Sequence, residues 1–235
     1  MLTIGFFLRI KDVGTPSLWF DESISSIAAL AILEKGMPIF DSGFFYGRAI
    51  LNTFFIATSF KIFGVNEFAG RLPSVFFGTL TIYLVYVIGS KWGNKRVGIL
   101  AALLLAFSVW EIAWSRQARM YQQLQFFYIL SLYLYYEFWT TKNIRILILL
   151  VISSVATMLT HIFGYSLVVI FLICSITFYF IENRKVRLSL KKVFPLAIAG
   201  ILLLGFVYYK GIISSVTGIE VNYYNKYIHL LKKDL

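Results

Sequence analysis

Long apolar segments are the feature that most restricts what this chain can fold into. A helix that crosses the hydrocarbon core of a bilayer needs about 20 mostly apolar residues. Runs close to that length follow one another through the chain, separated by short polar segments. They predict about six transmembrane helices between residues 71 and 210, at Pro73–Ser90, Val97–Trp114, Tyr121–Thr140, Ile144–Thr160, Tyr165–Ile181 and Val193–Tyr209.

Composition supports a membrane protein and excludes other classes. Hydrophobic residues make up 59% of the chain and charged residues only 14%, which is far from the average of soluble domains. The net charge of +11 does not indicate nucleic-acid binding, because the basic residues interrupt apolar runs instead of gathering on a soluble domain. The single cysteine, Cys174, excludes an intramolecular disulfide. We therefore expect one all-α, polytopic membrane domain over residues 1–235.

The first 70 residues have a different character. Met1–Ile10 is too short to cross a bilayer, so we interpret it as the end of a first span. The segment 11–70 is expected to form an external loop with interfacial helices. Apolar residues recur at helical spacing in Glu22–Lys35, and Phe44–Phe63 is apolar but interrupted by polar residues.

The basic residues of the connecting segments predict the orientation in the membrane. They gather on one side of the predicted spans, and by the positive-inside rule that side is cytoplasmic. The acidic pair near residue 21 and the tail 211–235 would then be extracytoplasmic, in a multi-pass protein of the cell membrane. The basic residues are Lys91, Lys95, Arg96, Lys142, Arg145, Arg184, Lys185, Arg187, Lys191 and Lys192.

Two adjacent carboxylates, Asp21 and Glu22, are the first chemical candidates. Acids among aromatic residues at a membrane surface are costly unless they are hydrated, paired or used. Asp21 could serve as a general base that accepts a proton from an acceptor hydroxyl. Glu22 could orient Asp21 or help to hold a divalent cation. The alternative is helix capping by Asp21 or Ser17, which explains one acid but not the second.

Three external arginines are candidates for binding an anion. Glu67 and Arg71 are spaced i, i+4, which predicts either a structural ion pair or an arginine that neutralises phosphate or fixes the acidic loop. Arg116 and Arg119 follow a predicted span and are expected on one helical face, where forked guanidinium donors suit a lipid phosphate. The alternative is anchoring at the membrane interface, which arginine and tryptophan commonly provide.

Two further residues are supporting candidates. His161 lies in a short external turn and could bind metal or substrate, although a lone histidine is more often a structural hydrogen-bonding residue. Arg48, close to Tyr46, is a second basic candidate on the same side. The sequence contains no phosphate-binding glycine loop and no nucleophile elbow.

Three motifs together resemble the GT-C glycosyltransferases. They are Leu18–Glu22 (LWFDE), Phe63–Ser74 (FGVNEFAGRLPS) and Trp114–Tyr121 (WSRQARMY), in this order. The chain is similar to family 39, which contains protein O-mannosyltransferases and the aminoarabinose transferase of lipid A. The resemblance extends over about Phe6–Asn183.

The resemblance implies transfer of a sugar from a polyprenyl-phosphate donor on the extracytoplasmic face. Asp21 would deprotonate the hydroxyl of a protein, lipid or glycan acceptor, which attacks the anomeric carbon with inversion. The leaving phosphate would be bound by basic residues with Tyr121 beside them, and Glu67, Arg48 and His161 would support the site. The basic residues in that role are Arg71, Arg116 and Arg119.

Two departures from the family pattern leave other functions open. The proline pair often found before the second motif is replaced by Phe45–Ala49, and the later spans and soluble C-terminal region of the family are not present, so we expect the N-terminal part of a GT-C fold. A transporter or lipid flippase is one alternative, although charges gather at external ends and no internal repeat is evident. A non-catalytic subunit that binds polyprenyl phosphate is another.

Overall fold

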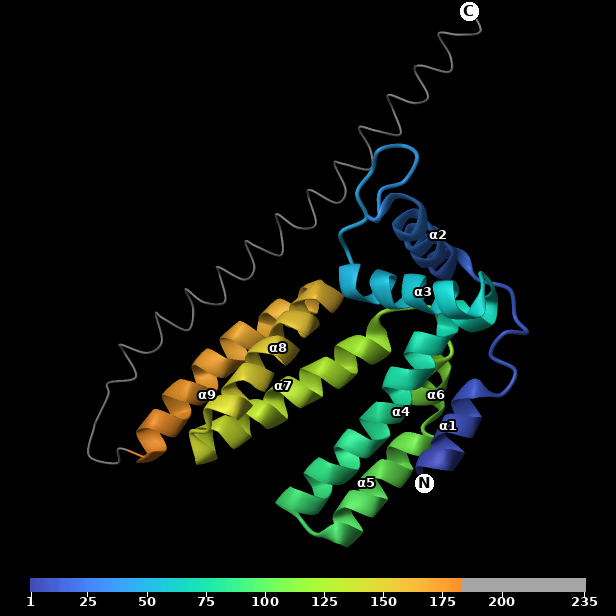
Figure 1. The fold of residues 1–235 in the computed structure, drawn as a ribbon. Coiled ribbons are helices and arrows are strands. Elements are labelled where there is room, and N and C mark those ends of the chain that lie inside the picture. Colours follow the sequence, from blue (N-terminus) through green and yellow to red (C-terminus); the bar gives the residue numbers. More distant parts are fainter. Residues whose placement is uncertain (183–235) are drawn as a thin grey trace, which may run out of the picture. The chain divides into compact units, whose positions relative to one another are not determined.

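The computed structural model describes residues 1–182, and the predicted all-α fold is confirmed there (Figure 1). The contacts divide the chain into two compact units, Met1–Phe40 with Phe45–Gly164, and a second unit whose described part is 41–44 and 165–182. The helices are α1 (Leu2–Ile10), α2 (Phe20–Lys35), α3 (Ile50–Phe63), α4 (Glu67–Trp92), α5 (Lys95–Phe107), α6 (Val109–Ser115), α7 (Tyr121–Thr141), α8 (Ile144–Thr160), the 3-10 turn η1 (Ile162–Tyr165) and α9 (Ser166–Glu182).

Asparagine side chains begin three of these helices. Asn66 accepts a hydrogen bond from the backbone of Ala69, Asn94 caps α5, and Asn143 accepts one from the backbone of Arg145. A polar N-cap satisfies backbone N–H groups that have no partner within the helix. The start of α8 therefore coincides with the predicted boundary.

The start of α4 differs from the sequence prediction. The predicted span begins at Pro73, a residue that suits the first turn of a helix, but α4 begins at Glu67, next to its cap at Asn66. Pro73 consequently lies inside the helix, where it cannot donate a hydrogen bond to the carbonyl of Ala69. The cap and the residues after it extend the helix by about one and a half turns.

The predicted span Val97–Trp114 is also wrong as a single helix. It consists of α5 and α6, which meet at a bend of 62°. Ser108 ends α5 and caps α6, because its hydroxyl accepts a hydrogen bond from the backbone of Glu111 at 3.5 Å. The turn that follows α6 contacts the start of α2, where the backbone N–H of Ala118 donates to Glu22.

A buried arginine in α1 binds this bend. Arg9 has no exposed surface, and its guanidinium donates to the carbonyls of Leu105 and Ala106, both at 3.2 Å. The same group donates to the Ser115 hydroxyl at 3.1 Å and to the carbonyl of Gly5 at 3.0 Å. Helix ends leave carbonyls without helical donors, so Arg9 supplies the hydrogen bonds that the interrupted helix lacks.

Two hydrophobic contacts organise the rest of the first unit. Small and apolar residues of α2, including Ala29 and Ile32, pack on Ile56 and Phe60 of α3. Further along the chain, Phe77 of α4 contacts phenylalanines of α3 and α7. Hydroxyl groups join α7 to α8 inside the bundle, where Ser131 and Ser153 are 2.9 Å apart.

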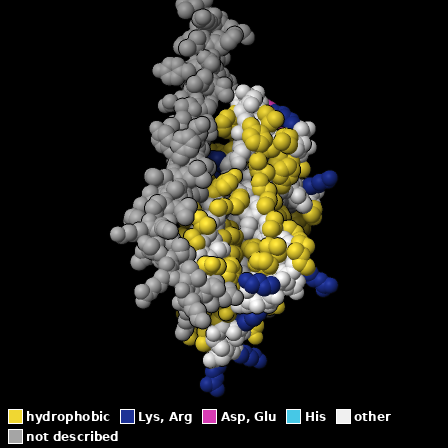
Figure 2. Space-filling view, turned by 90° about the vertical axis from the view of Figure 1, so that its left-hand side faces the viewer, with side chains coloured by type: hydrophobic (Ala, Val, Ile, Leu, Met, Phe, Trp, Pro, Cys, Tyr) yellow, Lys and Arg dark blue, Asp and Glu magenta, His cyan; other side chains and the backbone are white. Residues whose placement is uncertain are grey.

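By length and composition, two helical segments in the described residues can cross a membrane, Glu67–Trp92 and Ile162–Tyr179, and the bent α5 and α6 could form a third span together. The α3 and α8 helices are apolar but shorter. Apolar side chains cover much of the face in Figure 2, and basic side chains lie at its lower end, along its right edge and near its top. The predicted span Val193–Tyr209 and the tail 211–235 lie outside the described residues.

We expect Arg9→Leu to destabilise the fold. The variant leaves the carbonyls of Leu105 and Ala106 without donors, at a cost of about 1–3 kcal/mol for each buried group. Helical circular dichroism during heating in detergent measures the effect, with the exposed Arg96→Leu as the control. Equal unfolding temperatures in the two variants would contradict this role for Arg9.

Candidate active site

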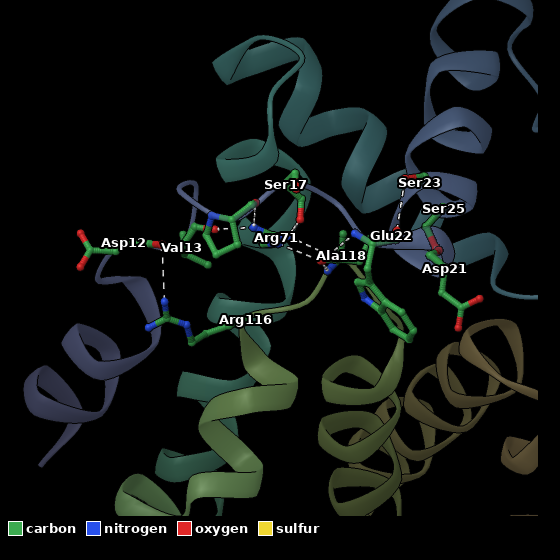
Figure 3. Close-up of polar contacts among 12 residues, drawn as sticks. Asp12, Val13, Ser17, Asp21, Glu22, Ser23, Ser25, Arg71, Arg116 and Ala118 are labelled. Atoms are coloured by element: carbon green, nitrogen blue, oxygen red, sulfur yellow. Dashed lines mark hydrogen bonds and ion pairs between the residues drawn. The ribbon is translucent and has the colours of Figure 1, made fainter.

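Glu22 is buried at a junction of four chain segments (Figure 3). Its carboxylate accepts hydrogen bonds from Arg71 Nε at 2.8 Å and from Arg71 Nη2 at 2.7 Å. It also accepts from the backbone N–H of Ala118 at 2.7 Å and of Trp19 at 3.3 Å. A carboxylate that is 1% exposed and has four donors is held in one orientation. Glu22 therefore joins the loop before α2, α2 itself, α4 and the turn after α6.

The protonation of Glu22 reflects these contacts. Burial alone would raise its pKa, but the hydrogen bonds from Arg71 and from the Ala118 backbone outweigh burial. The pKa of Glu22 therefore lies below its ordinary value. The carboxylate is ionised at neutral pH and is occupied by its partners.

Arg71 uses all of its donors inside the protein. Besides the two bonds to Glu22, its guanidinium donates to the carbonyls of Val13 at 2.8 Å, Pro16 at 2.7 Å and Ser17 at 3.1 Å. An arginine has five N–H donors, so none is left for a phosphate in this conformation. The predicted structural ion pair with Glu67 is wrong, and Arg71 instead fixes the acidic loop, which was its other predicted role.

Asp21 faces a different environment from its neighbour. Its side chain is 38% exposed and lies 3.6 Å from Arg119 Nη2. In Figure 3 it points away from Arg71. Adjacent helical residues point about 100° apart, which explains the separation. The predicted capping role is wrong for both Asp21 and Ser17, because the N-cap of α2 is Trp19.

The two arginines after α6 diverge. They were expected on one helical face, but α6 ends at Ser115 and the following turn separates them. Arg116 reaches the carbonyls of Leu8 and Asp12 near the end of α1, both at 3.4 Å. Arg119 instead donates to the carbonyl of Asp21 at 3.0 Å. Only Arg119 therefore lies beside the exposed carboxylate.

His161 and Tyr121 lie on the Arg119 side of Asp21. The Arg119 guanidinium lies 5.7 Å from the Tyr121 ring centre, and the Tyr121 and His161 rings are 6.2 Å apart. Burial, together with the positive charges of Arg48 and Arg119, lowers the pKa of His161. Arg48 is exposed. The structure thus brings four predicted residues together, from the segment before α3, the start of α7 and the end of α8.

Some contributors to the site were not predicted. The backbone N–H of Ala118 holds Glu22, and the Ser74 hydroxyl donates to the carbonyl of Arg119 at 2.9 Å. Both residues lie within the second and third sequence motifs, which is the signal that could have identified them. Arg9 lies outside all three motifs, and its only signal is a charge within an apolar segment.

The described residues contain no group of three histidine, cysteine or acidic side chains arranged to hold a metal ion. Glu22, the predicted helper in cation binding, has its oxygens on Arg71 and on backbone N–H groups. A divalent cation at this site therefore stays a prediction from the sequence.

We expect Glu22→Gln to destabilise the protein in a pH-dependent way. The variant leaves the Arg71 charge buried without its counterion, which costs about 3–5 kcal/mol. Because the pKa of Glu22 is lower in the folded state, its contribution is complete above the unfolded-state pKa and is lost as pH falls through the folded-state value. The difference between parent and variant should therefore shrink in acid.

Thermal unfolding in detergent at several pH values checks this expectation. The control is Glu34→Gln, which removes an exposed acid from the same helix. A difference between parent and Glu22→Gln that does not change with pH would contradict the assigned role of the Glu22 carboxylate.

Comparison with known proteins matches residues 47–209 to the family described as dolichyl-phosphate-mannose-protein mannosyltransferase. An uncharacterized protein of Aquifex aeolicus is 30% identical over 158 residues, which is 65% of this chain and 32% of that protein. The chain thus spans about a third of the length of this relative. No solved structure matches significantly.

The family match includes Arg48, Arg71, Arg119 and His161, while Asp21 and Glu22 precede the matched residues. The hydrogen bonds of Glu22 nevertheless connect the two parts of the chain, through Arg71 and Ala118. Because the match extends over more than half of the sequence and the described residues form apolar helices, this chain belongs to the dolichyl-phosphate-mannose-protein mannosyltransferase family of GT-C membrane glycosyltransferases.

Proposed function

We propose that the protein transfers a sugar from a polyprenyl phosphate to an acceptor hydroxyl, with Asp21 as the general base. The observation that carries this proposal is the contrast between the two adjacent acids. Glu22 is buried and fully bonded, whereas Asp21 is exposed beside Arg119, with His161, Tyr121 and Arg48 on the same side. One carboxylate is therefore free to accept a proton next to a group of positive charges.

The proposed reaction is a single displacement. Asp21 takes the proton of the acceptor hydroxyl, and the oxygen attacks the anomeric carbon of the donor. The bond between that carbon and the phosphate oxygen breaks, and its electron pair leaves with the polyprenyl phosphate. Attack from the side opposite the leaving group inverts the anomeric configuration.

Positive charge beside the site would stabilise the polyprenyl phosphate as it leaves. Fixed cations lower the energy of a transition state in which negative charge develops on the leaving group. Arg119 is 8% exposed and fixed by its contacts with the carbonyl of Asp21 and the hydroxyl of Ser25. Arg48 is exposed and has no ion-pair partner among residues 1–182, so it can meet a phosphate that approaches from outside.

We assign Arg71 and Glu22 to positioning and not to contact with substrate. Their pair holds the acidic loop against α4 and fixes the Ala118 backbone of the turn that carries Arg119. Arg116, whose guanidinium binds carbonyls of α1, holds the other side of the same turn. These residues set the separation between Asp21 and Arg119.

An extracytoplasmic location of the site is part of the proposal. The basic turns after α4 and α7 are joined by the ion pair of Lys91 with Glu137, at the end of α4 away from Arg71. The positive-inside rule makes that end cytoplasmic. The site then faces the outside, in a multi-pass protein whose donor is in the outer leaflet.

We expect the Asp21→Asn variant to lose sugar transfer but still to bind the polyprenyl-phosphate lipid. Loss of a general base lowers kcat by about 100- to 10 000-fold, but the phosphate contacts remain. The measurement is transfer from labelled polyprenyl-phosphate sugars in membranes, together with binding of unlabelled polyprenyl phosphate. The control Asp12→Asn removes another acid, one on the exposed loop after α1.

Unchanged transfer in Asp21→Asn would exclude Asp21 as the base. If the parent bound polyprenyl phosphate without transferring sugar, the chain would be a binding subunit and not a complete enzyme. If it moved the lipid between leaflets instead, the flippase alternative would hold.

Arg48→Gln tests the phosphate side of the site separately. Because the exposed guanidinium is proposed to attract the donor phosphate, we expect the donor KM to rise about tenfold, the effect of about 1.4 kcal/mol, with kcat close to that of the parent. Initial rates over a range of donor concentrations measure both constants. Lys61→Gln, on the exposed end of α3, controls for the loss of one positive charge; an equal rise in KM there would indicate a nonspecific effect.

A further inference from the structure

A cavity lies at the end of α4 and α7 far along the helices from Asp21. It has a volume of about 430 Å³ and is lined by Lys91, Trp92 and Tyr136. The proposed transferase does not use any of these residues. The cavity therefore needs its own explanation.

The cation in this cavity is fixed in place. Lys91 Nζ lies 2.6 Å from the Glu137 carboxylate and 5.6 Å from the centre of the Tyr133 ring. The Lys91 side chain is still 50% exposed, whereas Glu137 is 9% exposed. An ammonium group has three donors, so Lys91 can bind a further acceptor from the open side.

Aromatic rings form the wall beside this cation. Trp92 contacts Tyr136 edge to face, with ring centres 5.2 Å apart, and Tyr133 at 6.3 Å. Trp92 is 55% exposed. Tryptophan and tyrosine at the end of a membrane helix typically lie at the level of the lipid headgroups.

Exposed basic residues gather at this end of the helices. Two turns carry exposed basic residues, and the contact of Lys91 with Glu137 brings these turns to the same end of the helices. Basic side chains lie at the lower end of the face in Figure 2. The exposed basic residues in and beside these two turns are Lys95, Arg96, Lys142 and Arg145.

We propose that this cavity binds the headgroup of an anionic phospholipid, with the phosphate on Lys91 and the acyl chains along the apolar surface of α4. The geometry combines a half-exposed cation, aromatic walls and a basic surrounding, which suits a phosphodiester at a membrane surface. A soluble anion would make no contact with the aromatic and apolar surfaces beside Lys91. The lipid would hold the ends of α4 and α7 together independently of sugar transfer.

The ion pair of Lys91 with Glu137 allows a test in which two variants should change lipid binding in opposite directions. Lys91→Gln removes the cation, so binding of the anionic lipid should weaken. Glu137→Gln removes a negative charge 2.6 Å from that cation and leaves Lys91 to the phosphate, so binding should strengthen. A site elsewhere on the basic surface would respond much less to either change.

The experiment uses the intact chain in phosphatidylcholine vesicles that contain acyl-brominated phosphatidylglycerol. Bromine quenches tryptophan fluorescence at short range, and the difference between the parent and Trp92→Phe isolates the signal of Trp92. Lys11→Gln is the control, because it removes an exposed charge outside the cavity.

The proposal expects saturable quenching of Trp92 by phosphatidylglycerol, about tenfold weaker binding in Lys91→Gln, tighter binding in Glu137→Gln and no change in Lys11→Gln. It is overturned if brominated phosphatidylcholine quenches equally, if the two cavity variants behave alike, or if millimolar inorganic phosphate displaces the lipid. None of these outcomes depends on transferase activity.

Discussion

The pair of Glu22 with Arg71 is the interaction on which the site depends. It connects residues 49 positions apart, and its remaining hydrogen bonds reach the loop before α2 and the turn after α6. Burying two charges is costly unless nearly every polar atom has a partner. Here the carboxylate has four donors and the guanidinium has five acceptors. The buried ion pair therefore fixes the backbone that carries the outward-facing residues.

Local helix geometry then gives two adjacent acids opposite environments. One carboxylate points into the junction and the next points out of it, beside Arg119. Burial first, and then the positive charges of Arg48 and Arg119, lowers the pKa of His161 on this outer side. In the proposed reaction, Arg119, which lies 3.6 Å from Asp21, would reduce the repulsion between that carboxylate and an anionic donor.

The sequence predicted the helices better than their connections. The uninterrupted apolar run predicted both ends of α8, and the family motifs pointed to the segments that the contacts of Glu22 bring together, while the roles of Asp21 and Arg119 stay predictions. The bend at Ser108 was missed because hydropathy averaged over a span does not detect a single capping serine. The i, i+4 spacing suggested Glu67 as the partner of Arg71, but a contact across 49 residues depends on tertiary packing that spacing cannot show.

The buried Arg9 has a consequence for how the protein is assembled in the membrane. Its acceptors at Ala106 and Ser115 are 97 and 106 residues further along the chain, so they do not yet exist when α1 is synthesised. A guanidinium in lipid without partners is costly. Apart from the Gly5 carbonyl, Arg9 therefore gains its hydrogen-bond partners only after α5 and α6 have been made. Packing of α1 with its buried charge satisfied consequently depends on segments 97 and 106 residues further along the chain.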